Sequence, residues 1–112
     1  MKEATEFLPL TAPVFHILLA LADDERHGYA ILQEVERRSN GSVSLGTGTL
    51  YTAIKRMLDW GIIEKAESRL DPGLDDDRRR YYRITPLGQQ VARAEAARMD
   101  SLVGLARDKQ VL

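Results

Sequence analysis

Hydrophobic positions in the first half of the chain recur with the period of an α-helix and predict three helices. The first covers about residues 8–22 and is apolar on two nearly opposite sides, which predicts burial on both sides. The second is expected over residues 27–39 and is ended by Asn40-Gly41. The third is expected over residues 47–60. It has one apolar face, and Gly61 is a natural residue to end it.

Beyond the third helix the apolar pattern becomes short and alternating, which predicts two strands, over residues 62–68 and 80–84. A polar segment over residues 70–77 provides the turn between them. Residues 42–45 also alternate, and they are expected to form either a first strand or an extended linker. A helix followed by a two-stranded flap is the winged helix-turn-helix layout. The predicted fold is therefore mainly α-helical with a small β-hairpin.

The C-terminal region is expected to form one long helix. Thr85 is a suitable N-cap, Pro86 fits the first helical position, and the helix is expected to reach about residue 109. Its apolar positions repeat at spacings of four and three residues, as in a coiled coil. The repeating residues are Ala92, Ala96, Met99, Val103 and Ala106, with Val91, Leu102 and Leu105 beside them. We therefore divide the chain into a winged helix domain, 1–85, and a dimerisation helix, 86–112.

The second apolar stripe of the first helix needs a cover of its own, either the C-terminal helix or a second subunit. Packing of the long helix against the first helix of a second subunit would cover both surplus apolar surfaces. The stripe of the first helix expected at that interface is Leu10, Val14, Ile17 and Leu21. The sequence thus predicts a homodimer, because a small domain of this kind is often completed by oligomerisation.

Composition sets limits on the function. The 112 residues are 44% hydrophobic and 29% charged with a net charge of −1, so no global basic field draws the chain to nucleic acid. Binding of double-stranded DNA must come from a local patch. Cysteine is absent, which suits a cytoplasmic protein. The apolar run over residues 8–22 is too short to span a bilayer, so no membrane association is expected.

The third helix carries the main candidates for DNA contact. Thr47 and Thr49 place hydroxyl groups at a helix N-terminus, where backbone N–H groups favour a phosphate, and either residue can cap the helix. The other candidates on this helix are Tyr51, Thr52, Lys55 and Arg56. Lysine and arginine at a base edge most often read guanine. The alternative is an ordinary solvated face of an amphipathic helix.

Basic residues of the flap are the second candidate set. They are Arg78, Arg79, Arg80 and Arg83, helped by Lys65 and Arg69 across the hairpin, and they could hold DNA phosphates. The acidic run 75–77 stands directly before the arginines. The alternative interpretation is therefore that acids and arginines pair on the surface and contribute little.

No catalytic or metal-binding set is found. His16 and His27 lack a carboxylate or cysteine at metal-ligand spacing, so both are interpreted as structural. Trp60 is expected to pack beneath the flap, with stacking on a ligand as the alternative. We expect no enzyme activity, no cofactor and no metal.

Several short segments together resemble the PadR-like transcriptional regulators. They are His27-Gly28-Tyr29, Gly48-Thr49-Leu50-Tyr51, Lys55-Arg56-Met57-Leu58, Gly61-Ile62-Ile63, and the run from Tyr81 to Gly88. The resemblance implies a dimeric repressor that binds a palindromic operator and is released by a small-molecule effector. It adds Tyr29 and Gly48 to the DNA-binding candidates. The long helix lacks the aromatic residue that some members use to stack flat drugs.

The chief alternative function is a winged helix used as a protein–protein interaction module without sequence-specific DNA binding. The near-neutral charge and the acidic flap favour it.

Overall fold

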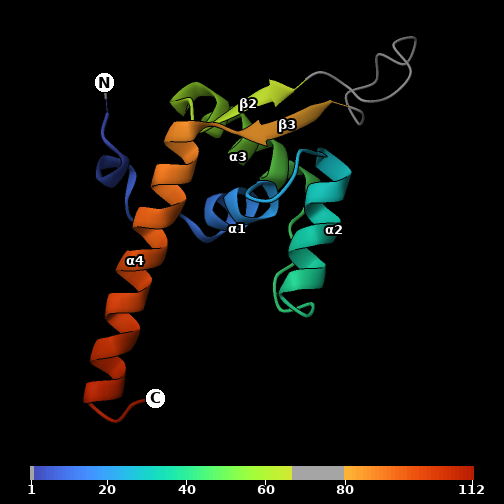
Figure 1. The fold of residues 1–112 in the computed structure, drawn as a ribbon. Helices are drawn as coiled ribbons and strands as arrows, with labels where there is room; N and C mark the ends of the chain where they lie inside the picture. Colours follow the sequence, from blue (N-terminus) through green and yellow to red (C-terminus); the bar gives the residue numbers. More distant parts are fainter. Residues whose placement is uncertain (1, 67–79) are drawn as a thin grey trace.

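The computed structural model describes residues 2–66 and 80–112, which form a mainly helical body with a small sheet (Figure 1). A short 3-10 helix, η1, precedes four α-helices in this part of the chain. The helices are η1 (Ala4–Phe7), α1 (Ala12–Leu21), α2 (Gly28–Arg38), α3 (Thr47–Trp60) and α4 (Pro86–Asp108). The strands β1 (Arg26–His27), β2 (Ile63–Ala66) and β3 (Tyr81–Ile84) form an antiparallel sheet in the order β1-β3-β2. This arrangement confirms the predicted winged helix-turn-helix fold with a long C-terminal helix.

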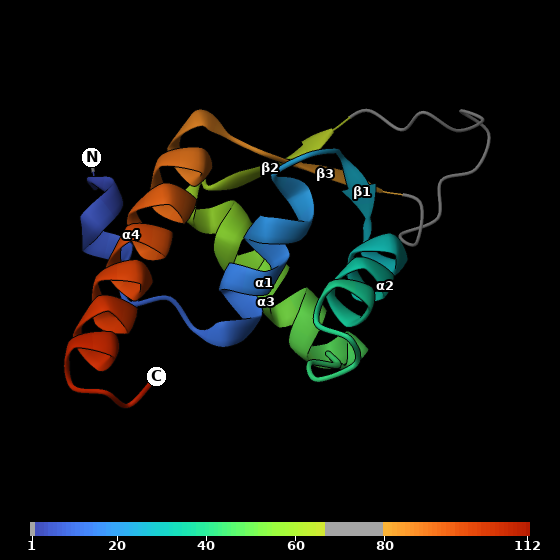
Figure 2. The same ribbon diagram turned by 60° about the horizontal axis from the view of Figure 1, so that its bottom comes forward.

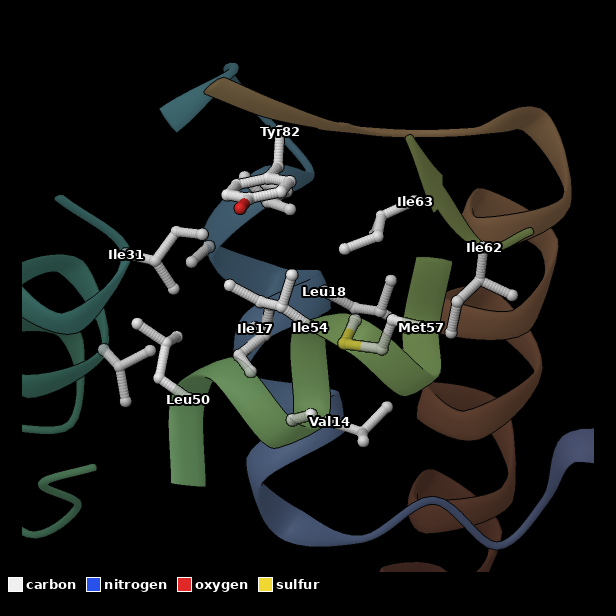
Figure 3. Packing of buried hydrophobic residues seen from close by; sticks show 14 of the residues in the cluster. Val14, Ile17, Leu18, Ile31, Leu50, Ile54, Met57, Ile62, Ile63 and Tyr82 are labelled. Atoms are coloured by element: carbon white, nitrogen blue, oxygen red, sulfur yellow. The ribbon is translucent and has the colours of Figure 1, made fainter. Parts of the chain in front are cut away.

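The core lies where α1, α2 and α3 meet beneath the sheet (Figure 3). Ile17 of α1, Ile31 of α2 and Met57 of α3 are fully buried there, and Tyr82 covers them from β3. Each helix contributes residues three and four positions apart, which lie on one face of a helix. This shared core fixes α3 against the rest of the domain.

The prediction for the first helix needs two corrections. It begins at Ala12 instead of residue 8, because the Thr11 hydroxyl caps it by accepting from the Val14 amide at 3.4 Å. The stripe assigned to a partner is covered by the chain itself: Val14, Ile17 and Leu21 are at most 2% exposed, and Leu10 is half-buried. The dimer assignment of this stripe is therefore wrong. Helical periodicity marks a face as buried without saying which neighbour buries it.

The third strand of the sheet lies where no strand was predicted. Residues 42–45 form no strand, and β1 instead pairs with β3 through Arg26 opposite Tyr82 and His27 opposite Tyr81. A two-residue strand with charged and polar side chains carries no alternating apolar signal. The His27 side chain also caps α2, accepting from the Ala30 amide at 3.2 Å.

Helix α4 starts as predicted and then leaves the body of the molecule (Figures 1 and 2). Thr85 caps it, accepting from the Gly88 amide at 3.0 Å, and Pro86 follows in the first turn. We call residues 86–98 the proximal half and residues 99–108 the distal half. Val91 and Glu95 of the proximal half are fully buried. The apolar residues of the distal half are largely exposed: Met99, Leu102, Val103 and Leu105 are exposed, and Ala106 is half-buried.

Within residues 2–66 and 80–112, no helix is both long enough and apolar enough to cross a bilayer. The same residues contain no group of three or more His, Cys, Asp or Glu side chains that could hold a metal ion.

Candidate nucleic-acid interface

Helix α3 presents a polar face to solvent because its apolar face is held in the core. Leu50, Ile54 and Met57 are at most 2% exposed, which turns the opposite side of the helix outward. All the candidates that the sequence placed on this helix are exposed: Thr47, Gly48, Thr49, Tyr51, Thr52, Lys55 and Arg56. The structure thus brings seven of the predicted residues onto one exposed surface.

The N-terminus of α3 is capped differently from the prediction. Gly46 occupies the N-cap position and has no side chain to accept from the first amides. Thr47 and Thr49 lie inside the first turn, and their side chains are exposed and do not cap the helix. The prediction that one of them caps the helix is therefore wrong. Their hydroxyls stand beside a helix end whose dipole favours an anion.

Gly28 at the start of α2 sets the position of Tyr51. A Cβ atom at Gly28 would lie 2.5 Å from the Tyr51 hydroxyl oxygen, so a larger residue there would require the Tyr51 side chain to shift. Tyr29, the next residue of α2, is 59% exposed at the same end of the helix. The motif His27-Gly28-Tyr29 thus contributes to the packing of α2 against α3, and its Tyr29 is also a candidate for DNA contact. Sequence reasoning singled out the motif without seeing this role of Gly28.

The sheet adds basic residues beside α3. Lys65 pairs with Tyr82 across β2 and β3, so their side chains share one face of the sheet, and Arg80 lies on that face two residues before Tyr82. Tyr82 is buried on α3, whereas Lys65 and Arg80 are exposed farther along the same face. Together with Lys55 they line a shallow groove between α3 and the sheet, and Tyr51 also lines it. Three cations, from α3, from β2 and from the residue just before β3, therefore line one groove.

The opposite face of the sheet has a different role. Arg83 forms an ion pair with Glu64 on the neighbouring strand, with Nε and Oε1 2.6 Å apart. Arg69, Arg78, Arg79 and the acidic run 75–77 lie outside the described residues, so the choice between a phosphate clamp and surface ion pairs stays open for them.

Lys55 and Arg56 occupy opposite flanks of α3. Lys55 lines the groove beside the sheet, whereas Arg56 lines a second groove with Thr49 and Thr52, next to the start of α1. The Arg56 guanidinium lies 5.9 Å from the centre of the Trp60 ring. Lys55 and Arg56 therefore line two different grooves on the exposed side of α3.

Trp60 contacts a segment that the sequence did not single out. Its ring contacts Phe7 of η1, with ring centres 5.6 Å apart. This contact is not predictable from sequence, because the two residues are distant in the chain and η1 has no amphipathic pattern.

A buried carboxylate on α2 forms ion pairs with three arginines. Glu34 of α2 is 6% exposed and pairs with Arg26, Arg37 and Arg38. Burial alone would raise the pKa of Glu34, but the hydrogen bonds from Arg37 and Arg38 and the charges of Arg26 and Arg37 hold it below its usual value. These arginines thus share the negative charge of Glu34 in a structural cluster at α2.

Solved structures share this fold. A PadR family transcription regulator from Clostridium difficile superposes with a TM-score of 0.72 at 22% identity, covering 89% of this chain and 99% of that one. Bacillus subtilis PadR, solved in complex with operator DNA, superposes with a TM-score of 0.65 at 22% identity, covering 77% of this chain and 47% of that one. At these identities the likeness concerns the fold.

Sequence comparison extends the likeness to the family. An uncharacterized protein X of Lysinibacillus sphaericus is 36% identical over 73 residues, which are 65% of this chain and 64% of that relative. The chain therefore spans less than two thirds of this relative. The pattern of the transcriptional regulator PadR-like family matches residues 17–94, more than half of the chain. The chain thus belongs to the PadR-like family of transcriptional regulators.

Proposed function

We propose that this chain is a transcriptional repressor that binds a palindromic operator as a homodimer and is released by a small-molecule effector. The observation that carries DNA binding is the groove beside α3, where Lys55, Lys65 and Arg80 meet in a chain of net charge −1. Such a local patch is what a protein without a basic field needs to attract a phosphate backbone.

In this proposal α3 enters the major groove and the sheet lies over the adjacent backbone. The major groove is about 12 Å wide and admits one helix. Lys55 is placed to reach a base edge, while Lys65 and Arg80 contact phosphates beside the helix. Tyr51, held against Gly28, lies at the boundary between these two kinds of contact. Phosphate contacts set the register, and base contacts supply the sequence preference.

The homodimer is supported by the apolar distal half of α4. Leu102 is 53% exposed and Leu105 is 59% exposed, and both lie beside the predicted coiled-coil repeat. Leu19 of α1, on the side away from the core, is 48% exposed. We place the dimer interface on these exposed residues of α4 and α1, and no longer on the buried stripe of α1. A second copy of the chain would cover both surfaces.

A direct connection between α4 and α3 supports release by an effector. The Thr85 hydroxyl donates to the Gly61 carbonyl at 2.6 Å, and the Thr85 amide donates to the Ile62 carbonyl at 3.2 Å. The start of α4 is therefore fastened to the end of α3. A change in the angle between two α4 helices would move the two α3 helices and alter their spacing on DNA.

The decisive experiment measures duplex binding by fluorescence anisotropy at several salt concentrations. Wild-type protein is expected to bind a labelled random-sequence duplex of about 30 base pairs with an affinity that falls steeply with salt, because phosphate contacts release counterions. Lys55→Ala should weaken binding to a selected operator by about tenfold or more. Lys109→Ala, at the far end of α4, is the matched control and should leave affinity unchanged.

An absence of duplex binding at low salt would contradict the proposal and favour the protein-interaction alternative. Selection from a random DNA library tests the palindrome. The proposal requires two inverted half-sites whose centres lie about one helical turn apart or a multiple of it. Recovery of single, unpaired sites would overturn the symmetric dimer.

A further inference from the structure

The flank of α3 that faces away from the sheet carries a stack of three side chains. The Arg56 guanidinium lies over the Trp60 ring at 5.9 Å, and the Trp60 ring meets Phe7 at 5.6 Å with a tilt of 58°. Arg56 is exposed, Trp60 is half-buried and Phe7 is 9% exposed. The stack therefore runs from the solvent surface of α3 into the body of the protein.

Helix geometry explains why Arg56 meets Trp60. Residues four apart lie above one another on a helix, and helical side chains point back toward the N-terminus, so the Trp60 ring leans onto Arg56. A guanidinium over an indole face is attracted by the ring quadrupole. This contact restricts the Arg56 side chain before DNA is bound. Less conformational entropy is then lost when the side chain contacts DNA.

The far side of the stack is anchored to α4. Phe7 belongs to η1, and the chain that follows is fixed where the Leu10 amide donates to Glu95 Oε2 at 2.7 Å. Glu95 is fully buried in the proximal half of α4 and also pairs with Arg98. The Trp60 ring is thus held from behind by a segment that is itself tied to α4.

Arg56 stands among groups suited to a phosphate. It lines a shallow groove with Thr49 and Thr52, whose side chains are exposed. Guanidinium and hydroxyl donors are the side chains that most often contact DNA phosphates. This groove lies on the other side of α3 from the one lined by Lys55, Lys65 and Arg80.

We propose that Trp60, backed by Phe7, is a positioning residue that presents Arg56 to a DNA backbone phosphate on the flank of α3 away from the sheet. The inference rests on the proposed DNA binding and adds a second line of phosphate contact to it. The two flanks of α3 would then contact the backbone on both sides of the helix.

A double-mutant cycle tests this role with the same labelled random-sequence duplex. Arg56→Ala is expected to reduce the slope of log affinity against log salt by about one per protomer, because one phosphate contact is lost. Trp60→Leu should weaken binding about two- to fivefold, since the stacking that orders the guanidinium disappears. In the Arg56→Ala background, Trp60→Leu should cause no further loss. Trp60→Phe keeps an aromatic face and should recover most of the affinity.

Two controls separate positioning from folding. Arg93→Ala removes an exposed arginine from α4 and should leave the salt slope unchanged. Trp60 is the only tryptophan of the chain, so its fluorescence reports on the stack without DNA. Arg56→Ala should change that emission, and Phe7→Leu should change it as well.

The outcomes are distinguishable. Equal losses from Trp60→Leu in the wild-type and Arg56→Ala backgrounds would overturn the positioning role, because Trp60 would then act on α3 independently of Arg56. Unchanged fluorescence in Arg56→Ala would overturn the stack itself. If wild-type protein failed to bind duplex while the fluorescence responses were as expected, the proposed function would fail and the stack would stand as a structural feature only.

Discussion

The two halves of α4 belong to one continuous helix but have different surroundings. In the proximal half Val91 and Glu95 are fully buried, and Gly88 lies against the backbone of Ile62. In the distal half Leu102 and Leu105 are more than half exposed. The helix is therefore packed on the domain core in its proximal half and uncovered in its distal half.

The difference indicates what the distal half requires. A helical segment of about ten residues without tertiary contacts is marginal in water, because most helix stability in proteins comes from packing an apolar face. Each large apolar side chain that becomes covered contributes about 1.5–3 kcal/mol. A second copy packed along this half would provide that cover, whereas the proximal half is already stabilised by its own chain.

The largest expected effect comes from charging the distal half. Met99→Asp should raise the dimer dissociation constant at least about 100-fold, because it buries an unpaired carboxylate at the proposed interface, a cost of about 3 kcal/mol. Analytical ultracentrifugation measures it. Ser101→Asp adds the same charge on the other side of the helix and should leave the dimer intact. A dimer mass unaltered by Met99→Asp would break the comparison between the two halves.

The next largest effect is expected in the proximal half from Gly88→Ala. The new Cβ would lie 2.0 Å from the Ile62 carbonyl oxygen and 2.8 Å from Cγ1 of Ile84, so α4 must move away from the end of α3. We expect a loss of about 3 kcal/mol in the free energy of unfolding, measured by urea denaturation. Unchanged stability would show that α4 is not seated against Ile62.

Glu95→Gln should have an intermediate and pH-dependent effect. The hydrogen bond from Arg98, helped by that from the Leu10 amide, holds the pKa of Glu95 below its ordinary value of 4.5 in spite of burial. Because the pKa is lowered in the folded state, the ionised Glu95 carboxylate stabilises the fold above about pH 4.5. This contribution is lost as the pH falls further and the carboxylate becomes protonated. The variant should therefore be less stable than wild type by about 1–3 kcal/mol near neutral pH.

Denaturation of the Glu95→Gln variant and wild type at several pH values checks this expectation. The difference between them should shrink as the pH falls from about 7 to about 3. A difference that is constant over this range would mean that the charge of Glu95 plays no part and that only its shape matters.

The smallest effect is expected from Gly104→Ala in the distal half. A Cβ atom there meets nothing within 4 Å of the described chain, in contrast to Gly88. Alanine should raise the free energy of unfolding by about 0.5–1 kcal/mol, because glycine loses more conformational freedom in a helix. Destabilisation by Gly104→Ala would instead sharpen the picture of the interface, since it would place a partner directly against this position.

Local chemistry made several features predictable from sequence. Gly61 ends α3 in the left-handed conformation, and Thr85 with Pro86 starts α4, because these residues act through the backbone of their own segment. The exposed face of α3 followed from the position of its apolar residues. The division of the chain at residue 85 stays a prediction.

Contacts between distant segments were not predictable. β1 is too short to carry a pattern, and the meeting of Trp60 with Phe7 depends on the path of η1. Likewise, the separation of Lys55 and Arg56 onto two flanks depends on which elements lie on each side of α3. The cover over Val14 and Ile17 of α1 was assigned to the wrong neighbour for the same reason.

The sequence by itself determined the period of each helix, the caps at Gly61 and Thr85, and the set of residues that α3 turns outward. Periodicity and capping are properties of a single segment, so they can be read without knowing the rest of the molecule. Only the tertiary structure decided which neighbour covers each apolar stripe and which cations share a groove. Those outcomes depend on the packing of segments far apart in the chain, and a one-dimensional pattern does not contain that packing.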